Sequence, residues 1–162
     1  MRPLTPDDFA ACHSWGGNPA NVRWMAWGPN SEEQTRAFLK SVTPGKDFAV
    51  ALEASGEVIG SCGIYPDEDM DTGDMGWILH MDYHRRGYGT EIVAELLRYG
   101  FEDLKLRRLW ACCAADNYGS RRVMERNGMR REATKFKAFW ARIDKEWIDR
   151  AEYAILAEEY FR

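Results

Sequence analysis

The sequence predicts one α+β domain. Its 162 residues are enough for a single domain with a sizeable core. Segments with the pattern of strands and segments with the pattern of helices occur along the whole chain. No internal repeat, linker or low-complexity stretch divides it. We therefore expect residues 1–162 to form one unit.

The first third of the chain predicts a short strand followed by two helices. Arg2–Thr5 suits a strand, and Pro6–Asp8 opens a helix with early acidic residues that runs to about Trp15. Two glycines and a proline within Gly16–Pro19 cannot continue a helix. The first helix therefore ends there, and an irregular or short helical stretch follows over residues 18–30.

The second helix is expected to begin at Ser31. The side chains of Ser31 and Gln34 fit a capping box, which satisfies backbone donors at the start of a helix. Phe38 and Leu39 are expected on its apolar face. The Thr43–Gly45 segment contains a proline and a glycine, so both ends of this helix are marked in the sequence.

Three strands are expected in the middle of the chain: Phe48–Glu53, Val58–Tyr65 and Met75–Met81. Residues 54–57 have turn chemistry and join the first two strands into a hairpin. The acidic stretch Pro66–Asp74 is expected to be a loop. The third strand is mostly apolar, which indicates that it is buried.

The second half of the chain predicts two further helices and three further strands. Apolar residues at 92, 93, 96, 97 and 100–101 recur with helical spacing. Asn127-Gly128 is a typical helix stop. The expected elements are a helix over Glu91–Phe101, a strand over Leu106–Ala114, a helix from the cap Asn117 to Arg126, and two long strands over about 129–140 and 146–157.

The turn from the third strand into the next helix is a candidate anion site. Gly87 and Gly89 leave the first backbone N–H groups of the helix without internal partners, and the helix dipole adds positive charge. Arg85 and Arg86 add charge beside them, and Thr90 adds a hydroxyl. Taken alone, the segment is also explained by an ordinary turn with a solvated basic pair. It is neither a Walker loop nor the dinucleotide fingerprint, because the lysine and the third glycine of those motifs are missing.

Two motifs occur in a fixed order along the chain. The first is His84-Arg85-Arg86-Gly87-Tyr88-Gly89-Thr90-Glu91, between a strand and a helix. The second is Asn117-x-x-Ser120-x-x-x-Met124-Glu125-Arg126-Asn127-Gly128-Met129. Together with the opening Arg2–Asp8 and the closing Tyr153–Leu156, these resemble the GNAT acetyltransferase superfamily over essentially the whole chain. The likeness is greatest to the branch of the RimJ/RimL-type ribosomal-protein N-terminal acetyltransferases.

This resemblance implies the GNAT fold, which is a mixed and mostly antiparallel sheet of about seven strands flanked by about four helices. It also implies that the sheet splays beside the third strand. There the pantetheine of acetyl-CoA lies like an extra strand against the backbone of Leu79 and Met81. The pyrophosphate then occupies the turn Arg85–Thr90, Asn117 reaches the pantetheine arm, and Ser120 lies near the thioester sulfur.

The implied reaction is direct attack of a neutral amine on a thioester carbonyl. It needs a base, a polarised carbonyl and a proton donor for the thiolate. Ser120 is the candidate donor, with local hydrogen bonding in the helix as the alternative. His84 departs from the Gln or Arg that is usual in the family, and Met124 replaces a tyrosine with a thioether that cannot donate a proton. Asp74 is the candidate base, and Asp69, Asp71, His80, His84 and a water relay are left open as alternatives.

Three tryptophans, Trp15, Trp24 and Trp27, and the acidic loop Asp67–Asp74 fall where relatives build the acceptor pocket. The four candidate substrate-binding residues among them are Trp24, Trp27, Asp69 and Asp71. Aromatic faces and carboxylates favour a cation, so the expected acceptor is the amine of a peptide N-terminus or a small cationic amine. The alternative is that the tryptophans pack the first helices onto the sheet and that the acidic residues are solvated.

The composition argues against several other classes of function. A net charge of −4 gives no basic field for nucleic acid. No apolar run reaches the roughly 18 residues of a membrane span, and the N-terminus lacks the apolar core of a signal peptide, so we expect a cytoplasmic protein. Cys12, Cys62, Cys112 and Cys113 form no C-x-x-C pair and are interpreted as reduced structural thiols. No metal site is apparent.

An acetyl-CoA-dependent N-acetyltransferase is the favoured hypothesis, and two others stay open. One is an acyl-CoA-binding sensor without catalysis, which Met124 and the lack of an obvious base permit. The other is a protein-interaction domain with an exposed aromatic surface. Turnover with any amine distinguishes the enzyme from the sensor, and binding of coenzyme A distinguishes both from the interaction domain. The long last strands are compatible with a homodimer.

Overall fold

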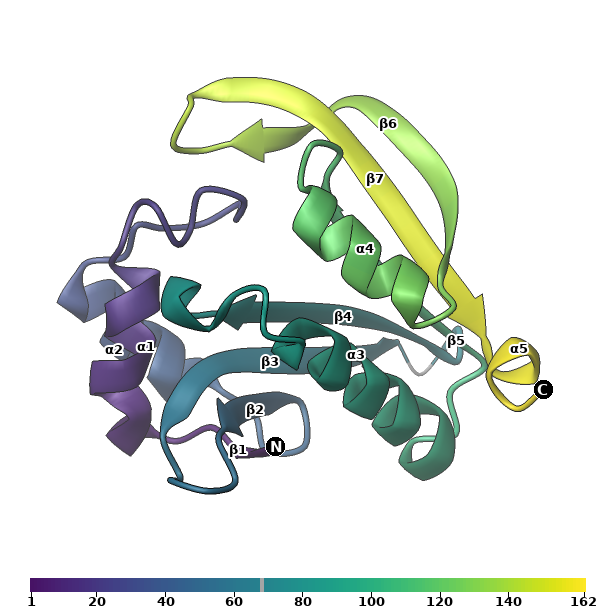
Figure 1. Ribbon diagram of the computed structural model, residues 1–162, viewed down its shortest axis with the longest axis horizontal. Helices are drawn as coiled ribbons and strands as arrows, with labels where there is room; N and C mark the ends of the chain where they lie inside the picture. The colour runs from purple at the N-terminus through teal and green to yellow at the C-terminus, as the bar shows by residue number, and fades with distance from the viewer. Residues whose placement is uncertain (68) are drawn as a thin grey trace.

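The computed structural model describes residues 1–67 and 69–162. Seven strands form one sheet in the order β1-β2-β3-β4-β5-β7-β6 (Figure 1). Only β4 and β5 pair in parallel, and every other pair is antiparallel. The strands are β1 Arg2–Pro3, β2 Asp47–Ala51, β3 Val58–Asp67, β4 Thr72–Leu79, β5 Arg108–Ala114, β6 Arg130–Ala141 and β7 Glu146–Leu156. The predicted fold class, a mixed and mostly antiparallel sheet with flanking helices, is confirmed.

The described part of the chain holds five α-helices, the last of which is a single turn. They are α1 Phe9–Gly16, α2 Glu32–Ser41, α3 Tyr88–Arg98, α4 Tyr118–Arg126 and α5 Ala157–Tyr160. The helices α1 and α2 cover one face of β2–β4, where Trp15 and Leu39 pack on Ala49 and Ile78. The helices α3 and α4 cover the opposite face. The sheet therefore separates two layers of helices.

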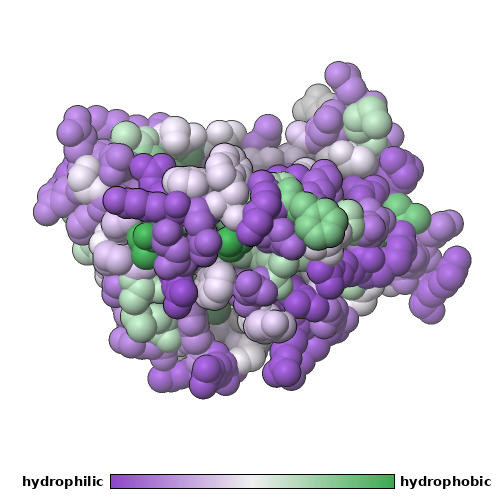
Figure 2. Space-filling model, turned by 90° about the horizontal axis from the view of Figure 1, so that it is seen from above, coloured by the Kyte–Doolittle hydropathy of each residue, from purple (hydrophilic) through white to green (hydrophobic). Residues whose placement is uncertain are grey.

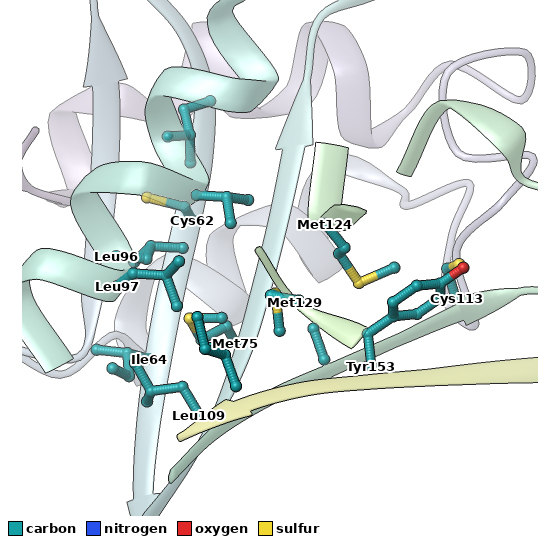
Figure 3. Close-up of a cluster of buried hydrophobic side chains, with 14 of the residues drawn as sticks. Cys62, Ile64, Met75, Leu96, Leu97, Leu109, Cys113, Met124, Met129 and Tyr153 are labelled. Carbon is teal, nitrogen blue, oxygen red and sulfur yellow. The ribbon is translucent and has the colours of Figure 1, made fainter. Parts of the chain in front are cut away.

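The larger core lies between the sheet and α3 and α4. Figure 3 shows Leu96 and Leu97 of α3 above Ile64, Met75 and Leu109, which belong to three neighbouring strands. Because successive strand residues point to opposite faces, every second residue of these strands enters this core. The helical spacing that predicted α3 is thus the pattern that buries it.

Some predicted boundaries are wrong. The stretch Pro66–Asp74 is not a single loop, because the ladder of β3 and β4 extends to the pair Asp67 and Thr72 and places Asp74 within β4. Glu68, also part of the predicted loop, lies outside the described residues. Met81 follows β4 and belongs to a 3-10 turn over Met81–Tyr83, so the predicted strand is two residues too long.

Three further expectations also need correction. The helix expected from Glu91 begins at Tyr88. Phe38 is 39% exposed whereas Leu39 is 2% exposed, so of these two residues it is Leu39 that is buried on the apolar face of α2. Cys112 is exposed, unlike the other three cysteines, because its strand position points away from the core.

The most important feature of the sheet is the separation of β4 from β5. They pair at only three positions, from Thr72 with Arg108 to Asp74 with Trp110. Beyond that point β5 stays paired with β7 as far as Ala114, whereas β4 stays paired with β3 as far as Leu79. The edges of Met75–Leu79 and of the end of β5 therefore diverge, as the resemblance implied.

One face of the molecule gives little sign of other large interaction sites. Figure 2, seen from above the view of Figure 1, shows a mainly hydrophilic face on which apolar side chains form small separate patches. Scattered apolar residues of this kind are normal on a protein surface. In the described ranges 1–67 and 69–162, no helix is long and apolar enough to cross a membrane.

Candidate functional site

The candidate site is the opening between β4 and β5, with a helix start on each side. The chain leaves β4 at Leu79 and enters α3 at Tyr88. It leaves β5 at Ala114 and enters α4 at Tyr118. The N-termini of α3 and α4 thus follow the two strands that separate, and each helix presents the N–H groups of its first turn at that end.

The glycines of the predicted anion site are required for two different reasons. Gly87 caps α3 with φ 93°, a left-handed conformation that favours glycine. A Cβ at Gly87 meets only Glu91 Oε1, at 3.9 Å, so the space beside it is open on the protein side. At Gly89 a Cβ lies 3.2 Å from Val123 Cγ2, so this glycine permits close packing of α3 on α4. The sequence analysis assigned both glycines to the ligand, and the structure gives Gly89 a packing role as well.

The remaining residues of this turn are exposed and basic or polar. Arg85 has φ 61°, an uncommon conformation for a residue with a side chain, and it is exposed. Arg86 is exposed and its guanidinium lies 5.3 Å from the ring centre of Tyr83. The Thr90 N–H donates to the Gly87 carbonyl, so within the first turn of α3 the N–H groups of Tyr88 and Gly89 are the ones left for an anion.

The exposed edge of β4 differs from the prediction at Met81. The His80 N–H donates to Ile59 of β3, so backbone groups of the odd-numbered residues Leu79 and Trp77 point toward the opening. The Met81 N–H instead donates to Asn21 Oδ1 at 2.7 Å. The sequence analysis named Leu79 and Met81 and omitted Trp77, which alternation along the strand could have supplied.

The buried Asn21 fastens the end of β4 and was also missed. Its Nδ2 donates to the Leu79 carbonyl at 2.9 Å, and its Oδ1 accepts from Met81. His84 Nε2 also lies 3.1 Å from the Leu79 carbonyl oxygen. These contacts engage the Leu79 carbonyl, which leaves the Leu79 N–H and the backbone of Trp77 as the groups of this edge that can pair with a ligand. No local motif marks Asn21 in the sequence.

Asn117 and Ser120 lie together at the start of α4. Asn117 Oδ1 accepts from the Ser120 N–H at 3.2 Å, and Asn117 Nδ2 donates to Ser120 Oγ at 3.0 Å. The asparagine is therefore the helix cap that the sequence predicts. Because Ser120 Oγ acts as an acceptor toward Asn117, its own hydroxyl proton remains available for donation. The local hydrogen bond that was the alternative for Ser120 is present and leaves the donor role open.

Met124 does not occupy the opening. It is 0% exposed and packs in the larger core, where Figure 3 shows it beside Met129, Tyr153 and Cys113. The Tyr153 hydroxyl donates to Glu125 Oε1 at 2.8 Å and accepts from Arg121 Nε at 3.3 Å. This part of α4 is thus a packed surface. The hydroxyl groups of Tyr118 and Ser120 lie in the first turn of the helix, and that of Ser120 is held by Asn117.

Asp74 is the last residue of β4 that pairs with β5. Its side chain points to the same face as Gly76 and Ile78, because strand residues two apart share a face. Burial raises the pKa of Asp74 from 3.8 to about 6, although a hydrogen bond from the Met75 N–H and the charge of Arg150 both act to lower it. A carboxyl group with this pKa is ionised near neutral pH and is a stronger base than an ordinary aspartate.

Charged residues of β6 and β7 lie near Asp74 on this face. Glu152 pairs directly with Cys112, and Lys135 Nζ lies 2.9 Å from its carboxylate. Arg150 donates from Nη2 to the same carboxylate, and it is close enough to lower the pKa of Asp74. Within the part of the chain that the structure describes, the buried Nε of Arg150 has no hydrogen-bond partner. The site therefore has a free donor near its candidate base.

The predicted acceptor residues are not brought together. Asp69 and Asp71 lie on the exposed turn before β4, at the opposite end of that strand from Leu79. The guanidinium of Arg23 lies over the ring of Trp24, with its central carbon 5.2 Å from the ring centre. Trp27, in contrast, lines a cavity on the face of the sheet that α1 and α2 cover. Of the four residues, only Trp27 is placed where it can contact a ligand beside the sheet.

His80 is a poorer candidate for the base. Its Nδ1 accepts from the Asp82 N–H at 3.2 Å and so caps the 3-10 turn after β4. His80 lies just after the end of β4 at Leu79, and its side chain has a structural role there. Asp74 is thus the half-buried carboxylate that geometry and pKa together place at the opening.

Comparison with known proteins agrees with this geometry. A family model described as an acetyltransferase (GNAT) domain matches residues 1–130. The uncharacterized N-acetyltransferase YnaD of Bacillus subtilis (strain 168) is 32% identical over 162 aligned residues, covering 99% of this chain and 94% of YnaD. A GNAT-family acetyltransferase structure from Bacillus anthracis is 33% identical with a TM-score of 0.90, covering 98% of this chain and 94% of that one.

A third similar protein supports the fold alone. The spermidine N-acetyltransferase of Vibrio cholerae, solved in complex with CoA and spermine, has a TM-score of 0.88 and 17% identity, covering 99% of this chain and 96% of that one. The family model spans most of the chain, and the relatives of higher identity cover nearly all of it. This chain therefore belongs to the GNAT acetyltransferase family.

Proposed function

We propose that this protein transfers the acetyl group of acetyl-CoA to a primary amine. The observation that carries the proposal is the separation of β4 from β5 directly after Asp74. The N-terminus of α3, with its free N–H groups, follows β4 at this opening. The hydrogen-bonded pair Asn117 and Ser120 follows β5. A carboxylate whose pKa is raised to about 6 lies where the strands part. An anion site, an unpaired strand edge, a base and a hydroxyl are thus arranged around one opening.

The residues present fit acetyl-CoA. The space beside Gly87 is open, and the first N–H groups of α3 with Arg85 and Arg86 suit a pyrophosphate. The unpaired edge of β4 at Trp77 and the Leu79 N–H suits the amides of pantetheine, as an extended ligand adds to a sheet. The structural neighbour from Vibrio cholerae, a spermidine N-acetyltransferase, was solved with CoA.

The chain supplies a base and a proton donor for the transfer. Bound acetyl-CoA would supply the acyl carbon that the amine attacks and the sulfur that leaves. Asp74 accepts the proton that the amine loses as its nitrogen forms the new bond to carbon. Ser120 Oγ, held by Asn117, would donate a proton to the sulfur as the carbon–sulfur bond breaks. Ser120 would then regain a proton from solvent, and Asp74 would release to solvent the proton that it took from the amine. The products are an N-acetylated amine and a free thiol.

The acceptor and the branch of the family are further parts of the proposal. The two quoted motifs favour the RimJ/RimL-like branch, and the expected acceptor is a peptide N-terminus or a small cationic amine. Glu152 is already paired with Lys135 and Arg150, so the carboxylate of Asp74 is the group on this face that attracts a protonated amine before it loses its proton. A homodimer built on the long strands β6 and β7 stays part of the hypothesis.

The first test is isothermal titration of the purified protein with acetyl-CoA. We expect binding by the wild type, loss of binding in Gly87→Trp, and at least tenfold weaker binding in Arg86→Glu. Lys40→Glu is the control, because it changes the net charge equally on α2, beyond the opposite face of the sheet. Absence of binding by the folded wild type would refute the proposal and favour an interaction domain.

Turnover is measured next as release of thiol with a panel of amines. Release that depends on an amine supports the transferase. Binding of acetyl-CoA without turnover of any amine would favour the sensor, which is the hypothesis that the buried, non-donating Met124 keeps open.

A further inference from the structure

A cavity of about 430 Å³ lies on the face of the sheet that α1 and α2 cover. Its floor is formed by β3 and β4, and its walls come from α1, α2 and the segment between them. Cavities that bind small molecules range from about 300 to 1,000 Å³. The volume is therefore sufficient for one small organic group.

Two glycines that face each other lie in the floor of this cavity. Gly63 of β3 pairs directly with Gly76 of β4, so two neighbouring positions of one sheet face carry no side chain. A Cβ at Gly63 would lie 2.5 Å from the Tyr65 hydroxyl, which explains the glycine there by packing. A Cβ at Gly76 would meet nothing within 4 Å, and its φ is not positive.

Packing therefore does not explain Gly76. A glycine inside a strand costs stability relative to a residue with a side chain, and it often marks the close approach of a ligand. The one effect of Gly76 that the structure shows is to deepen the cavity. Its position also links the cavity to the chemistry, because Gly76 lies two residues after Asp74 on the same face of β4.

The walls of the cavity are aromatic and apolar. Trp15, which is 2% exposed, and Trp27 contribute indole rings, and Met25 and Phe38 add further apolar surface. Aromatic side chains and methionine sulfur favour contact with a flat ring. A single carboxylate lines the cavity in the described structure, and it is already engaged.

That carboxylate is Asp47. It accepts from the Tyr65 hydroxyl at 2.7 Å and from the Thr43 N–H at 2.8 Å. Asp69 and Asp71, on the turn before β4, are not among the residues that line the cavity. A ligand with a second positive charge, such as a polyamine, thus finds no free carboxylate inside.

We infer that the acceptor is an arylalkylamine, a primary amine joined to an aromatic ring by a short carbon chain. The inference rests on the proposed transferase function and names its substrate class. The ring lies on Gly76 between Trp15 and Trp27, and the amine extends toward Asp74. Two residues of a strand span about 6.6 Å, a distance that a two-carbon spacer can cover.

The test uses 2-phenylethylamine and spermidine as probes, and Gly76→Leu and Gly76→Ala as variants. A Cβ at Gly76 meets no protein atom within 4 Å, so both side chains begin in open space; leucine extends into the cavity, and alanine adds only a methyl group. We expect wild-type protein saturated with acetyl-CoA to acetylate 2-phenylethylamine with at least tenfold higher kcat/KM than spermidine. Gly76→Leu should raise the KM for 2-phenylethylamine at least tenfold more than Gly76→Ala does, with the KM for acetyl-CoA and the Tm unchanged.

Binding of 2-phenylethylamine, followed by tryptophan fluorescence, separates the two levels of the hypothesis. If the amine binds and Gly76→Leu abolishes binding, but no thiol is released with any amine, binding of the amine in the cavity is confirmed and the transferase function is refuted. If spermidine is acetylated and 2-phenylethylamine neither binds nor reacts, the transferase stands and the inference is overturned. An unchanged KM in Gly76→Leu overturns it too, and Trp27→Ala provides a second variant if the leucine variant does not fold.

Discussion

The raised pKa of Asp74 makes a prediction about activity and stability together. In the folded protein burial raises this pKa to about 6 from 3.8. About nine-tenths of the molecules therefore carry the carboxylate at pH 7, and about one-tenth at pH 5. With saturating amine, kcat should fall about tenfold per pH unit below pH 6, because the base is then protonated.

The raised pKa of Asp74 also makes the stability of the folded protein depend on pH. The folded pKa lies above the unfolded value, so the contribution of this carboxyl to stability is fully present below pH 3.8 and is lost as the pH rises through 6. A shift of about two units corresponds to about 3 kcal/mol, and partial exposure with solvent screening reduces this to about 1–2 kcal/mol. Holding Asp74 ionised thus destabilises the protein at neutral pH.

The perturbation is Asp74→Asn, which removes the ionisation and nearly keeps the shape. We expect the variant to be more stable than the wild type by about 1–2 kcal/mol at pH 8 and equal to it at pH 4, measured by urea unfolding. Its kcat should fall about 10²-fold or more at pH 8. Asp69→Asn, on the exposed turn before β4, is the control with the same loss of charge.

Two results would refute this reasoning. One is an Asp74→Asn variant that loses stability equally at pH 4 and pH 8, since the residue would then act through packing alone. The other is a variant with wild-type kcat, which would remove Asp74 as the base. Arg150→Gln gives a further check, because loss of the charge that lowers the pKa of Asp74 should move the acid limb of the kcat profile to higher pH.

The other two predictions concern the donor and the strand end. Ser120→Ala should lower kcat about 10²-fold without changing the KM for acetyl-CoA, because the Asn117 cap on the residue 120 N–H remains; an unchanged kcat would leave Ser120 only a structural role. Asn21→Ala should lower the free energy of unfolding by about 1–3 kcal/mol in urea, because the hydrogen bonds to Leu79 and Met81 are lost. Asn21→Asp keeps the acceptor for Met81 but sets a carboxylate oxygen against the Leu79 carbonyl, so it should also lose stability at neutral pH; equal stability of all three proteins would contradict the proposed clamp.

Features that depend on local chemistry could be predicted from the sequence. The cap Asn117, the glycine turn at Gly87 and the helical spacing of α3 each involve residues within one turn or one helix. Their physical causes act between near neighbours: a side-chain oxygen beside free N–H groups, a left-handed conformation, a repeating apolar face. The order of these elements predicted an α+β domain, and the opening beside the third strand was implied by the resemblance to the GNAT superfamily.

Features that depend on strand register could not be predicted. Nothing in the sequence around Gly63 or Gly76 indicates that these glycines face each other, because the register between strands is set by the whole ladder. The acidic segment before Asp74 looked like a loop, since its charges suggest solvent, yet backbone pairing continues through it. Asn21 lies 58 residues from its partner Leu79, and such a contact leaves no local pattern.

The packing of α4 on α3 explains how the two sides of the opening keep a fixed distance. Gly89 allows Val123 to approach closely, and Asn127 donates from Nδ2 to the Thr90 carbonyl at 3.2 Å and to the Val123 carbonyl at 2.9 Å. These contacts join the first turn of α3 to the second half of α4. Because α4 is one rigid helix, they also fix Ser120 at its start relative to the anion site. The distance from the candidate anion site to Ser120 is thus set by helix packing.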